Sequence, residues 1–388
     1  MTCEKILSDT RPDLTSWRRQ LHRNPEFGFD ENQTADFIVR RLREMGVNEI
    51  EQGIGGTGVV ATLRAGSSNK AIGFRADMDA LRIDEANDFE HRSEKPGLMH
   101  ACGHDGHVTM LLGAAHELSQ SPDFDGIIRL IFQPAEEWGK GMQAMLDNGL
   151  LERFPFEEAY GVHNMPGLPI GDFATAKGPI MGAEDLFTIT VTGRGGHSSR
   201  PHESNDALVA ACAIVVALQT IVSRRIDPSQ LAVVSVTEVV TDGTRNTIPG
   251  CVQIHGDARH FDTAVSDRIE AEMRRISHGV AGSYACNCEV SYSNAFIPLI
   301  NDAAMTENAL AAATAATQGD VDGDMARMGA SEDFARLLNH VPGNFMMIGN
   351  GPSLPLHNSG YDFNDAALPY GIRYFAELAR QRLPQNLS

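Results

Sequence analysis

Short apolar segments alternate with helical segments through the first half of the chain. The apolar segments lie at residues 58–63, 71–74, 127–132 and 159–162. Helical periodicity marks the stretches before and between them, at residues 14–23, 34–45, 108–118 and 142–150. Strands that are apolar along their whole length are buried on both faces, so helices must cover those faces. The chain is therefore predicted to be an α/β protein with a mostly parallel sheet.

The pattern changes at about residue 183. The elements expected from there are a strand, a helix, two strands, a helix and a strand, at residues 186–192, 205–225, 231–240, 250–259, 265–279 and 288–292. This β-α-β-β-α-β order is typical of a ferredoxin-like domain. Helix and strand alternation then resumes. We therefore expect a discontinuous catalytic domain, residues 1–182 and 294–388, with a compact domain inserted at 183–293.

The composition narrows the class of partner. The 388 residues include 32 Lys and Arg against 51 Asp and Glu, a formal net charge of −19. Nucleic acids and anionic membranes would repel such a chain, so we expect neither as a partner. Six scattered cysteines, of which Cys3 is the first, are too few for a disulfide framework. No signal peptide or membrane span is visible, and we expect a cytoplasmic protein.

Reactive side chains gather where the predicted strands end. Ligands of open α/β sheets bind beside the loops that leave the carboxyl ends of the strands. Those loops and strand ends carry Cys102, His104, Glu137, His163 and His357. Thiolate, imidazole and carboxylate together suit divalent zinc, manganese, nickel or cobalt. Because one tetrahedral ion needs fewer ligands, we predict two divalent metal ions that share a bridging ligand.

Adjacent carboxylates suggest a division of work at this site. One of Glu136 and Glu137 would bind metal while the other acts as a general base toward water, and the pattern does not say which. Taken alone, Cys102 would more often be a small buried residue and His163 a hydrogen-bonded one. Because five residues of these types lie together at strand ends and the adjoining loops, a metal site is the favoured interpretation. Asp77 and Asp79 either support the ligands or cap a turn.

Two other motifs do not predict a site. The glycines of residues 53–58 fit a dinucleotide-binding pattern, but a strand-like segment follows where a helix is required. Cys286 and Cys288 stand at the start of a strand in the inserted domain, far in sequence from the other ligands. We interpret these two cysteines as structural.

Nine segments, spread over nearly the whole chain, match one family. They are LHRNPEFG (21–28), FRADMDAL (74–81), MHACGHDGH (99–107), FQPAEE (132–137), GVHN (161–164), GGH (195–197), RNTIP (245–249), SEDF (331–334) and LHN (356–358). In these segments the sequence resembles the M20 metallopeptidases. The cysteine-containing segment places it in their amidohydrolase branch, with hippurate hydrolases, N-acyl-amino-acid amidohydrolases and plant auxin-conjugate hydrolases.

The resemblance implies a ligand set and its support. The five residues that it makes ligands of two metal ions are Cys102, His104, Glu137, His163 and His357. Cys102 would bridge the two ions. Asp77 and Asp105 would support the ligands from behind.

The resemblance also implies the remaining roles. Glu136 would be the general base that activates water and then protonates the leaving amine. His197, in the inserted domain, would stabilise the oxyanion, in this family often across a dimer interface. Asn246 and Arg259 would hold the substrate, because a guanidinium can bind both oxygens of an α-carboxylate. The alternatives for these two are a turn former and a strand-face salt bridge. A homodimer or homotetramer through the inserted domain is expected.

The expected activity is that of a metal-dependent amidohydrolase. It would cleave the N-acyl bond of a small-molecule N-acyl amino acid, with the inserted domain as a lid. Two alternatives stay open: a dipeptidase or aminopeptidase of the same fold, and a non-catalytic metal- or ligand-binding relative. Arg82 and Ser198–Ser199 depart from the residues common in the branch, and they concern which acyl groups and side chains are accepted.

Overall fold

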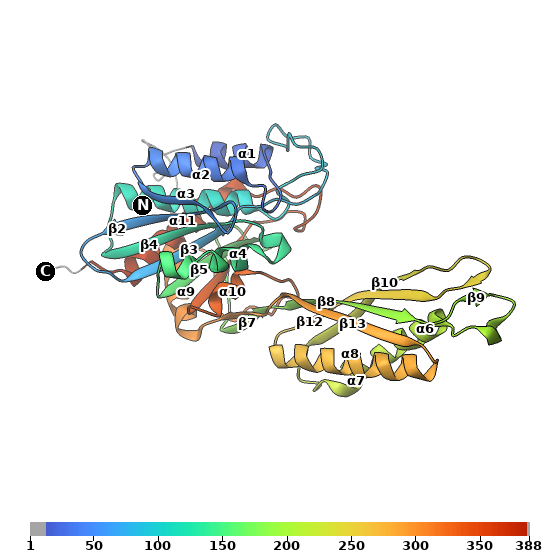
Figure 1. Cartoon of the computed structure of the whole chain (residues 1–388). Helices are drawn as coiled ribbons and strands as arrows, with labels where there is room; N and C mark the ends of the chain where they lie inside the picture. Colours follow the sequence, from blue (N-terminus) through green and yellow to red (C-terminus); the bar gives the residue numbers. More distant parts are fainter. Residues whose placement is uncertain (1–12, 386–388) are drawn as a thin grey trace. The chain divides into compact units, whose positions relative to one another are not determined.

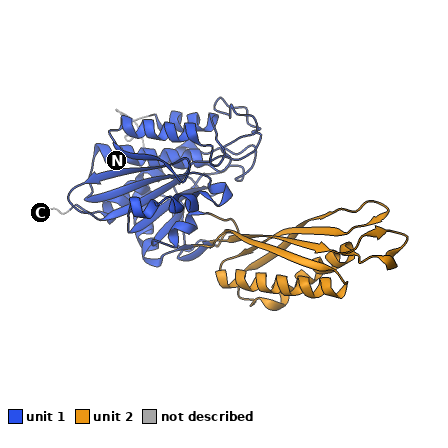
Figure 2. Ribbon diagram, viewed as in Figure 1, with its two compact units in different colours: residues 1–180, 300–326, 333–388 blue, residues 181–299, 327–332 orange. Residues whose placement is uncertain are grey.

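The computed structural model describes residues 13–385, which form two compact units. The predictions about Cys3 and about a signal peptide concern residues outside this range. Unit 1 comprises the described parts of Met1–Ile180, Ile300–Ala326 and Asp333–Ser388, and unit 2 comprises Met181–Leu299 and Arg327–Glu332. Figure 1 labels many of the elements, and Figure 2 colours the two units.

Unit 1 is built on an eight-stranded sheet with the order β1-β2-β4-β3-β5-β16-β6-β15. The strands are β1 (Glu49–Ile54), β2 (Gly58–Ala65), β3 (Ala71–Asp77), β4 (Gly126–Gln133), β5 (Glu158–Met165), β6 (Phe173–Ala174), β15 (Val321–Asp322) and β16 (Gly343–Gly349). The four central strands β4, β3, β5 and β16 are mutually parallel and almost entirely buried. The prediction of a mostly parallel α/β sheet is confirmed.

One edge of this sheet was not expected from the sequence. Strand β1 pairs antiparallel with β2, and most of its residues are exposed, so it lacks the apolar signal of the central strands. The glycine-rich residues 55–58 form the turn of this hairpin, with Gly55 and Gly56 at positive φ. The segment that follows is strand β2, as the sequence indicated, and no helix begins there to hold a dinucleotide.

Helices cover both faces of the sheet. They are α1 (Leu14–Arg23), α2 (Asn32–Glu44), α3 (His104–Gln120), α4 (Gly141–Asp147), α5 (Leu150–Arg153), α9 (Ala303–Ala316), α10 (Phe334–Leu338) and α11 (Leu368–Arg382). Helix α3 links β3 to β4, and α4 and α5 link β4 back across β3 to β5. Right-handed crossovers in opposite directions place α3 and α4 on opposite faces. No helix among residues 13–385 is both long and apolar enough to cross a membrane.

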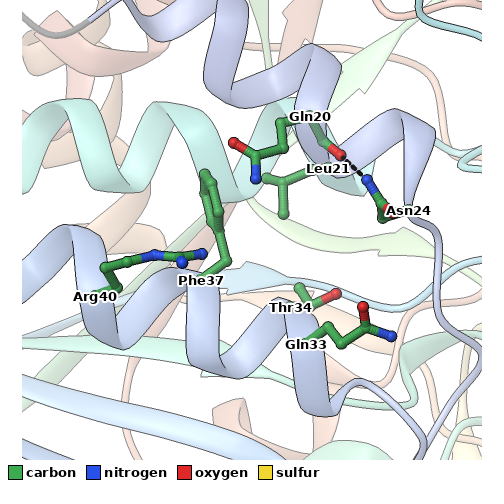
Figure 3. A pocket seen from close by; sticks show the side chains of 7 residues that line it. All are labelled: Gln20, Leu21, Asn24, Gln33, Thr34, Phe37 and Arg40. Atoms are coloured by element: carbon green, nitrogen blue, oxygen red, sulfur yellow. Dashed lines mark hydrogen bonds between the residues drawn. The ribbon is translucent and has the colours of Figure 1, made fainter.

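A small pocket lies between α1 and α2 (Figure 3). Its volume is about 150 Å³, and its lining consists of Gln20, Leu21, Asn24, Gln33, Thr34, Phe37 and Arg40. The side-chain amide of Asn24 donates to the backbone carbonyl of Gln20 at 3.0 Å, so one polar group of the pocket lining is already hydrogen-bonded within α1 and its C-terminal end. None of the predicted site residues lines this pocket.

Unit 2 has a four-stranded antiparallel sheet with the order β10-β12-β8-β13. Its elements follow the expected β-α-β-β-α-β order: β8 (Ala183–Thr192), α6 (Ala207–Leu218) with α7 (Thr220–Arg225), β10 (Ala232–Thr241), β12 (Cys251–His260), α8 (Thr263–Ser283) and β13 (Asn287–Phe296). Apolar residues of α6 and α8 form one core with those of the strands.

The boundaries of this unit differ from the predicted 183–293. Strand β13 continues to Phe296, and the unit ends at Leu299. Residues 327–332, assigned from sequence to the catalytic domain, also belong to unit 2. Their backbone carbonyls at Met328 and Ala330 accept hydrogen bonds from Gly182, a contact that no local sequence pattern reports.

Candidate active site

The five predicted ligands lie together in unit 1. Because β3, β4, β5 and β16 are parallel, the loops after them meet at one edge of the sheet. The Cys102 Sγ atom lies 3.5 Å from His163 Nε2. The Glu137 Oε1 atom lies 3.3 Å from His357 Nε2 and 3.9 Å from His104 Nε2. Cys102 and His163 thus form one pair of potential ligands, and Glu137 contacts both His357 and His104; Cys102, Glu137 and His357 also lie close enough to hold one ion.

The backbone around these residues is held in unusual conformations. Gly103, between two predicted ligands, has a φ of 91°, and a Cβ there would lie 2.2 Å from Asn164 Nδ2. Two residues that are not glycine also have positive φ: Ala135, at 48°, directly before Glu136, and His357, at 61°. Such conformations cost free energy and persist where the surroundings enforce them, often at functional sites.

Hydrogen bonds decide which ring nitrogen each histidine presents. His163 Nδ1 lies 2.8 Å from the backbone carbonyl of Asn164, which can only accept, so this nitrogen carries the proton. His104 Nδ1 similarly faces the Asp79 carboxylate at 3.3 Å. Both imidazoles are thus oriented with Nε2 directed into the cluster, the arrangement that metal-binding histidines usually have.

Two buried polar atoms in the cluster have no hydrogen-bond partner. They are His104 Nε2 and Glu137 Oε1, and buried polar atoms are nearly always satisfied. Burial opposes a charge on His104, but Asp77 and Asp79 outweigh it and raise the pKa of His104 to about 10. The carboxylates therefore create a strongly negative potential at these atoms. A divalent cation fits this arrangement because it would satisfy both atoms and meet the negative potential.

His107 and Asp77 lie in the same cluster, with ligand atoms close to those of His104 and His163. Their donor and acceptor atoms are already used, however. His107 Nδ1 bonds Asp77 at 2.6 Å, and His107 Nε2 accepts the backbone N–H of Asn164 at 2.9 Å. The other Asp77 oxygen accepts from Arg75 at 2.7 Å. Both residues therefore suit a supporting position.

The thiol of Cys102 is strongly affected by its surroundings. Burial raises its pKa well above the usual range, and the charges of Glu137 and Glu136 add to this effect. Burial lowers the pKa of His163 well below its usual range, so that ring is neutral. Because a metal binds the thiolate and not the thiol, metal binding through Cys102 would release a proton.

A second set of buried charges lies behind the cluster. Asp105, at the start of α3, bonds His22 at 2.8 Å and lies 3.5 Å from Arg18. Arg18 also bonds Asp362 at 2.9 Å and Asp365 at 2.6 Å, shortly after the loop of His357. Helix α1 thereby ties together the segments that carry His104 and His357. Asp105 also accepts the backbone N–H of Gly106 at 3.0 Å, so its carboxylate holds the first turn of α3 as well as these cations.

Of the predicted site residues of unit 2, His197 lies in a small two-stranded sheet and Asn246 lies in the turn directly before it. Its strands are β9 (Gly196–His197) and β11 (Thr247–Ile248), and Ser198 donates to the carbonyl of Asn246 at 3.0 Å. His197 Nδ1 accepts the backbone N–H of Ser199 at 3.1 Å, and the Ser199 hydroxyl lies 2.8 Å away. A backbone N–H can only donate, so neutral His197 carries its proton on Nε2.

Arg259 lies elsewhere in unit 2, on strand β12. Its guanidinium bonds Asp257 and Glu184, both at 2.8 Å, and also Ser331 at 3.1 Å. The strand-face salt bridge considered from the sequence is therefore present. These bonds use three of the five N–H donors of the guanidinium and leave one N–H on each terminal nitrogen.

Comparison with known proteins places the site in a family. The model of peptidase family M20/M25/M40 matches residues 73–381. The chain belongs to this family. It is 38% identical over 377 residues to the hippurate hydrolase of Campylobacter jejuni, covering 97% of this chain and 98% of that protein. It is 36% identical over 390 residues to thermostable carboxypeptidase 2 of Saccharolobus solfataricus, covering 97% and 98%.

A solved structure agrees with these relatives. The YXEP protein of Bacillus subtilis, described as a dinuclear metal binding peptidase of the M20 family, has a TM-score of 0.84 and 31% identity to this chain. The match covers 95% of this chain and 97% of that one. Together with the clustered donors of unit 1, this likeness supports the expectation of two metal ions.

The sequence left the role of Asp79 open between ligand support and a turn, and it did not single out Asn164 or Tyr361 as site residues. Asp79 bonds His104 and also accepts the backbone N–H of Glu137 at 3.1 Å, so it orients two predicted ligands at once. Tyr361 donates to Asn164 Oδ1 at 2.6 Å, and Asn164 donates to the Cys102 carbonyl at 2.6 Å. The only sequence signal was the acidic pair after β3, which also fits a turn.

Proposed function

We propose that this chain is a two-metal amidohydrolase that cleaves N-acyl amino acids into a carboxylate and a free amino acid. The observation that carries the proposal is the donor cluster of unit 1, in which His104 Nε2 and Glu137 Oε1 are buried without a hydrogen-bond partner. The name of the Campylobacter relative, a hippurate hydrolase, supports an N-acyl amino acid as the substrate class.

The proposed ligands are the five predicted residues Cys102, His104, Glu137, His163 and His357. Asp77 and His107 lie in the same cluster but are left out because their oxygens and ring nitrogens already take part in hydrogen bonds, and Glu136, close to His104 and Glu137, is assigned to proton transfer. Two divalent ions held there would polarise the substrate carbonyl and make water a better nucleophile. Zinc, manganese, nickel and cobalt all suit this mixture of sulfur, nitrogen and oxygen donors.

Protons are moved by the chain's own residues in this proposal. Glu136, buried next to Glu137 on the short helix η2 (Glu136–Trp138), accepts a proton from the attacking water and passes it to the leaving amine. His197 donates its Nε2 proton toward the oxygen that becomes negative, and Ser199 keeps that proton on Nε2. Asn246 and Arg259 bind the rest of the substrate, Arg259 through its α-carboxylate.

An apolar surface of unit 2 supports a homodimer or homotetramer. Helix α6 exposes Leu208, Val209 and Val216, and Val216 is 72% exposed. Strand β10 is an edge strand and exposes Val233, Val239 and Val240. An unpaired edge beside exposed apolar side chains is a common site of self-association. In the assembly, His197 would reach the site of a partner subunit.

We also propose a cytoplasmic location. The described cysteines, Cys102, Cys212, Cys251, Cys286 and Cys288, are all free. A reducing compartment keeps such thiols free, and Cys102 must stay reduced to bind metal.

A peptidase of the same fold is the second candidate function. The carboxypeptidase relative from Saccharolobus favours it, because its identity to this chain is nearly that of the hippurate hydrolase. Carboxypeptidases and N-acyl amino-acid hydrolases both need a free α-carboxylate on the leaving side. A panel of N-acetyl and N-benzoyl amino acids with dipeptides alongside separates the two, because only a peptidase would prefer the dipeptides.

The test of the proposed roles compares two adjacent glutamates. Glu136→Gln should retain two metal ions per subunit and lose turnover by roughly 10²–10⁴-fold, the usual contribution of a general acid and base. Glu137→Gln should lose metal as well as activity. Metal content would be measured by mass spectrometry and turnover by release of free amino acid. Near-normal activity of Glu136→Gln would refute its role as the base.

A further inference from the structure

Three aromatic rings gather at the surface of unit 1. The Trp138 ring packs edge-on against Phe27, with ring centroids 5.0 Å apart, and against Phe29, at 6.3 Å. Trp138 is nevertheless 40% exposed. Large aromatic side chains contribute most when they are buried, so a partly open group of three aromatic rings indicates a surface with a binding role.

This aromatic group borders the candidate active site. Trp138 directly follows Glu137, and consecutive Cα atoms lie only ~3.8 Å apart. Between the two phenylalanines stands Gly28, where a Cβ would lie 3.0 Å from the Cβ of Ala135. The Phe27–Phe29 segment is therefore pressed against the turn that leads into Glu136.

Two cations accompany the rings. The Arg82 guanidinium lies 4.0 Å from the centroid of Phe27, and the Lys140 ammonium lies 5.8 Å from that of Trp138. Both side chains are exposed. The chain as a whole has a net charge of −19, but these two cations make the aromatic surface locally positive, and they would attract a negatively charged ligand. The surface thus suits a ligand that has both an aromatic ring and a carboxylate.

We propose that Phe27, Phe29 and Trp138 bind the aromatic ring of an anionic substrate, and that the charges of Arg82 and Lys140 attract this substrate to the aromatic surface. The ring belongs either to an aromatic acyl group or to an aromatic amino acid. This inference rests on the proposed function, because the ring is useful there only if the amide bond reaches Glu136. It makes the aromatic surface the determinant of substrate preference.

Activity measurements test the preference. The substrates are N-benzoylglycine, N-acetyl-L-phenylalanine and N-acetylglycine. Trp138→Ala should lower kcat/KM about 3- to 10-fold for one or both aromatic substrates, the range expected for one aromatic contact, and less than twofold for N-acetylglycine. Trp138→Phe should restore most of the loss. The matched control is Tyr284→Ala, which removes an aromatic ring that is also 40% exposed but lies in unit 2.

The two aromatic substrates distinguish the source of the ring. A loss confined to N-benzoylglycine assigns the surface to the acyl group, and a loss confined to N-acetyl-L-phenylalanine assigns it to the amino acid. Equal losses for all three substrates, or no loss for any, would overturn the inference.

A binding measurement keeps the inference testable if the proposed function fails. The chain has two tryptophans, so Trp17→Phe leaves Trp138 as the only one. In metal-free protein, saturable quenching of Trp138 fluorescence by N-benzoylglycine or N-acetyl-L-phenylalanine, and not by N-acetylglycine, supports the aromatic surface without any turnover. Equal responses to the three compounds, or none, contradict it.

Discussion

Removal of the buried Arg18 charge should destabilise unit 1 far more than removal of its neighbour. The Arg18 side chain is 1% exposed and contacts three carboxylates, of which Asp105 is fully buried. Arg18→Met keeps an unbranched apolar side chain of similar reach but removes the cation that the three carboxylates share, so that Asp105 keeps only His22 and Asp365 keeps only Arg19. Removal of one partner from a buried ion pair costs about 3–5 kcal/mol, and the remaining pairs place the expected loss at the lower end of that range.

Arg19 supplies the matched control. It bonds the same Asp365 at 3.0 Å, but its side chain is 43% exposed. Exposed ion pairs contribute about 0.2–1 kcal/mol, so Arg19→Met should lie within that range. The two variants therefore remove adjacent arginines that share a partner and differ mainly in burial.

The assay is urea unfolding followed by tryptophan fluorescence. Both tryptophans, Trp17 and Trp138, belong to unit 1, so the signal reports that unit alone. Chelator-treated protein would be used to separate charge pairing from metal binding. If the unfolding free energies of Arg18→Met and Arg19→Met agree within about 0.5 kcal/mol, the network does not stabilise unit 1 in the way its geometry indicates.

Three further predictions follow from the structure. Burial opposes a charge on His22, but the Asp105 carboxylate outweighs this effect and raises the pKa of His22 to about 9. The charged ring therefore stabilises the fold fully below about pH 6.5, and this stabilisation is lost as the pH rises through 9. The stability difference between the unmodified chain and His22→Gln should thus shrink from pH 6.5 to 9.5 in urea unfolding, and growth with pH would contradict this. Gly103→Ala should lose bound metal, whereas Gly46→Ala, at a φ of 85° with open space around it, should keep its metal content. Val216→Asp should convert the proposed oligomer to a monomer in sedimentation velocity, and an unchanged size would place the interface elsewhere.

The central strands of the fold were predictable because their signal is local. Strands β3 and β4 are buried along their whole length, and nearly all of β5 is, so each appears in the sequence as a short apolar run. Strand β1 was missed because its residues are mostly exposed and its place in the sheet depends on the hairpin with β2. The affiliation of residues 327–332 with unit 2 depends on distant backbone contacts and has no local signal either.

In the candidate site, too, the residues with a local sequence signal were predicted and the contacts between distant residues were not. Cys102 and His163 were predicted because they stand at loops and strand ends, and the resemblance to a family supplied their roles. The role of Asp79 stayed open between ligand support and a turn, because an acidic residue after a strand fits both equally well. The partners of Arg259 were also beyond local patterns, since Glu184 is 75 residues away and meets it only across the pairing of β8 and β12.

The contacts of Arg18 can form only late in synthesis, because two of its partners lie near the C-terminal end of the chain. Arg18 and Asp365 are separated by 347 positions, so a ribosome adding about 5–20 residues per second makes the second roughly 17–70 s after the first. Throughout that interval helix α1 has an arginine without its final partners, and the loop of His357 has not been synthesised. The unfinished chain can thus offer a metal ion only part of the donor cluster. Full metal capture is thereby reserved for chains whose synthesis is nearly complete.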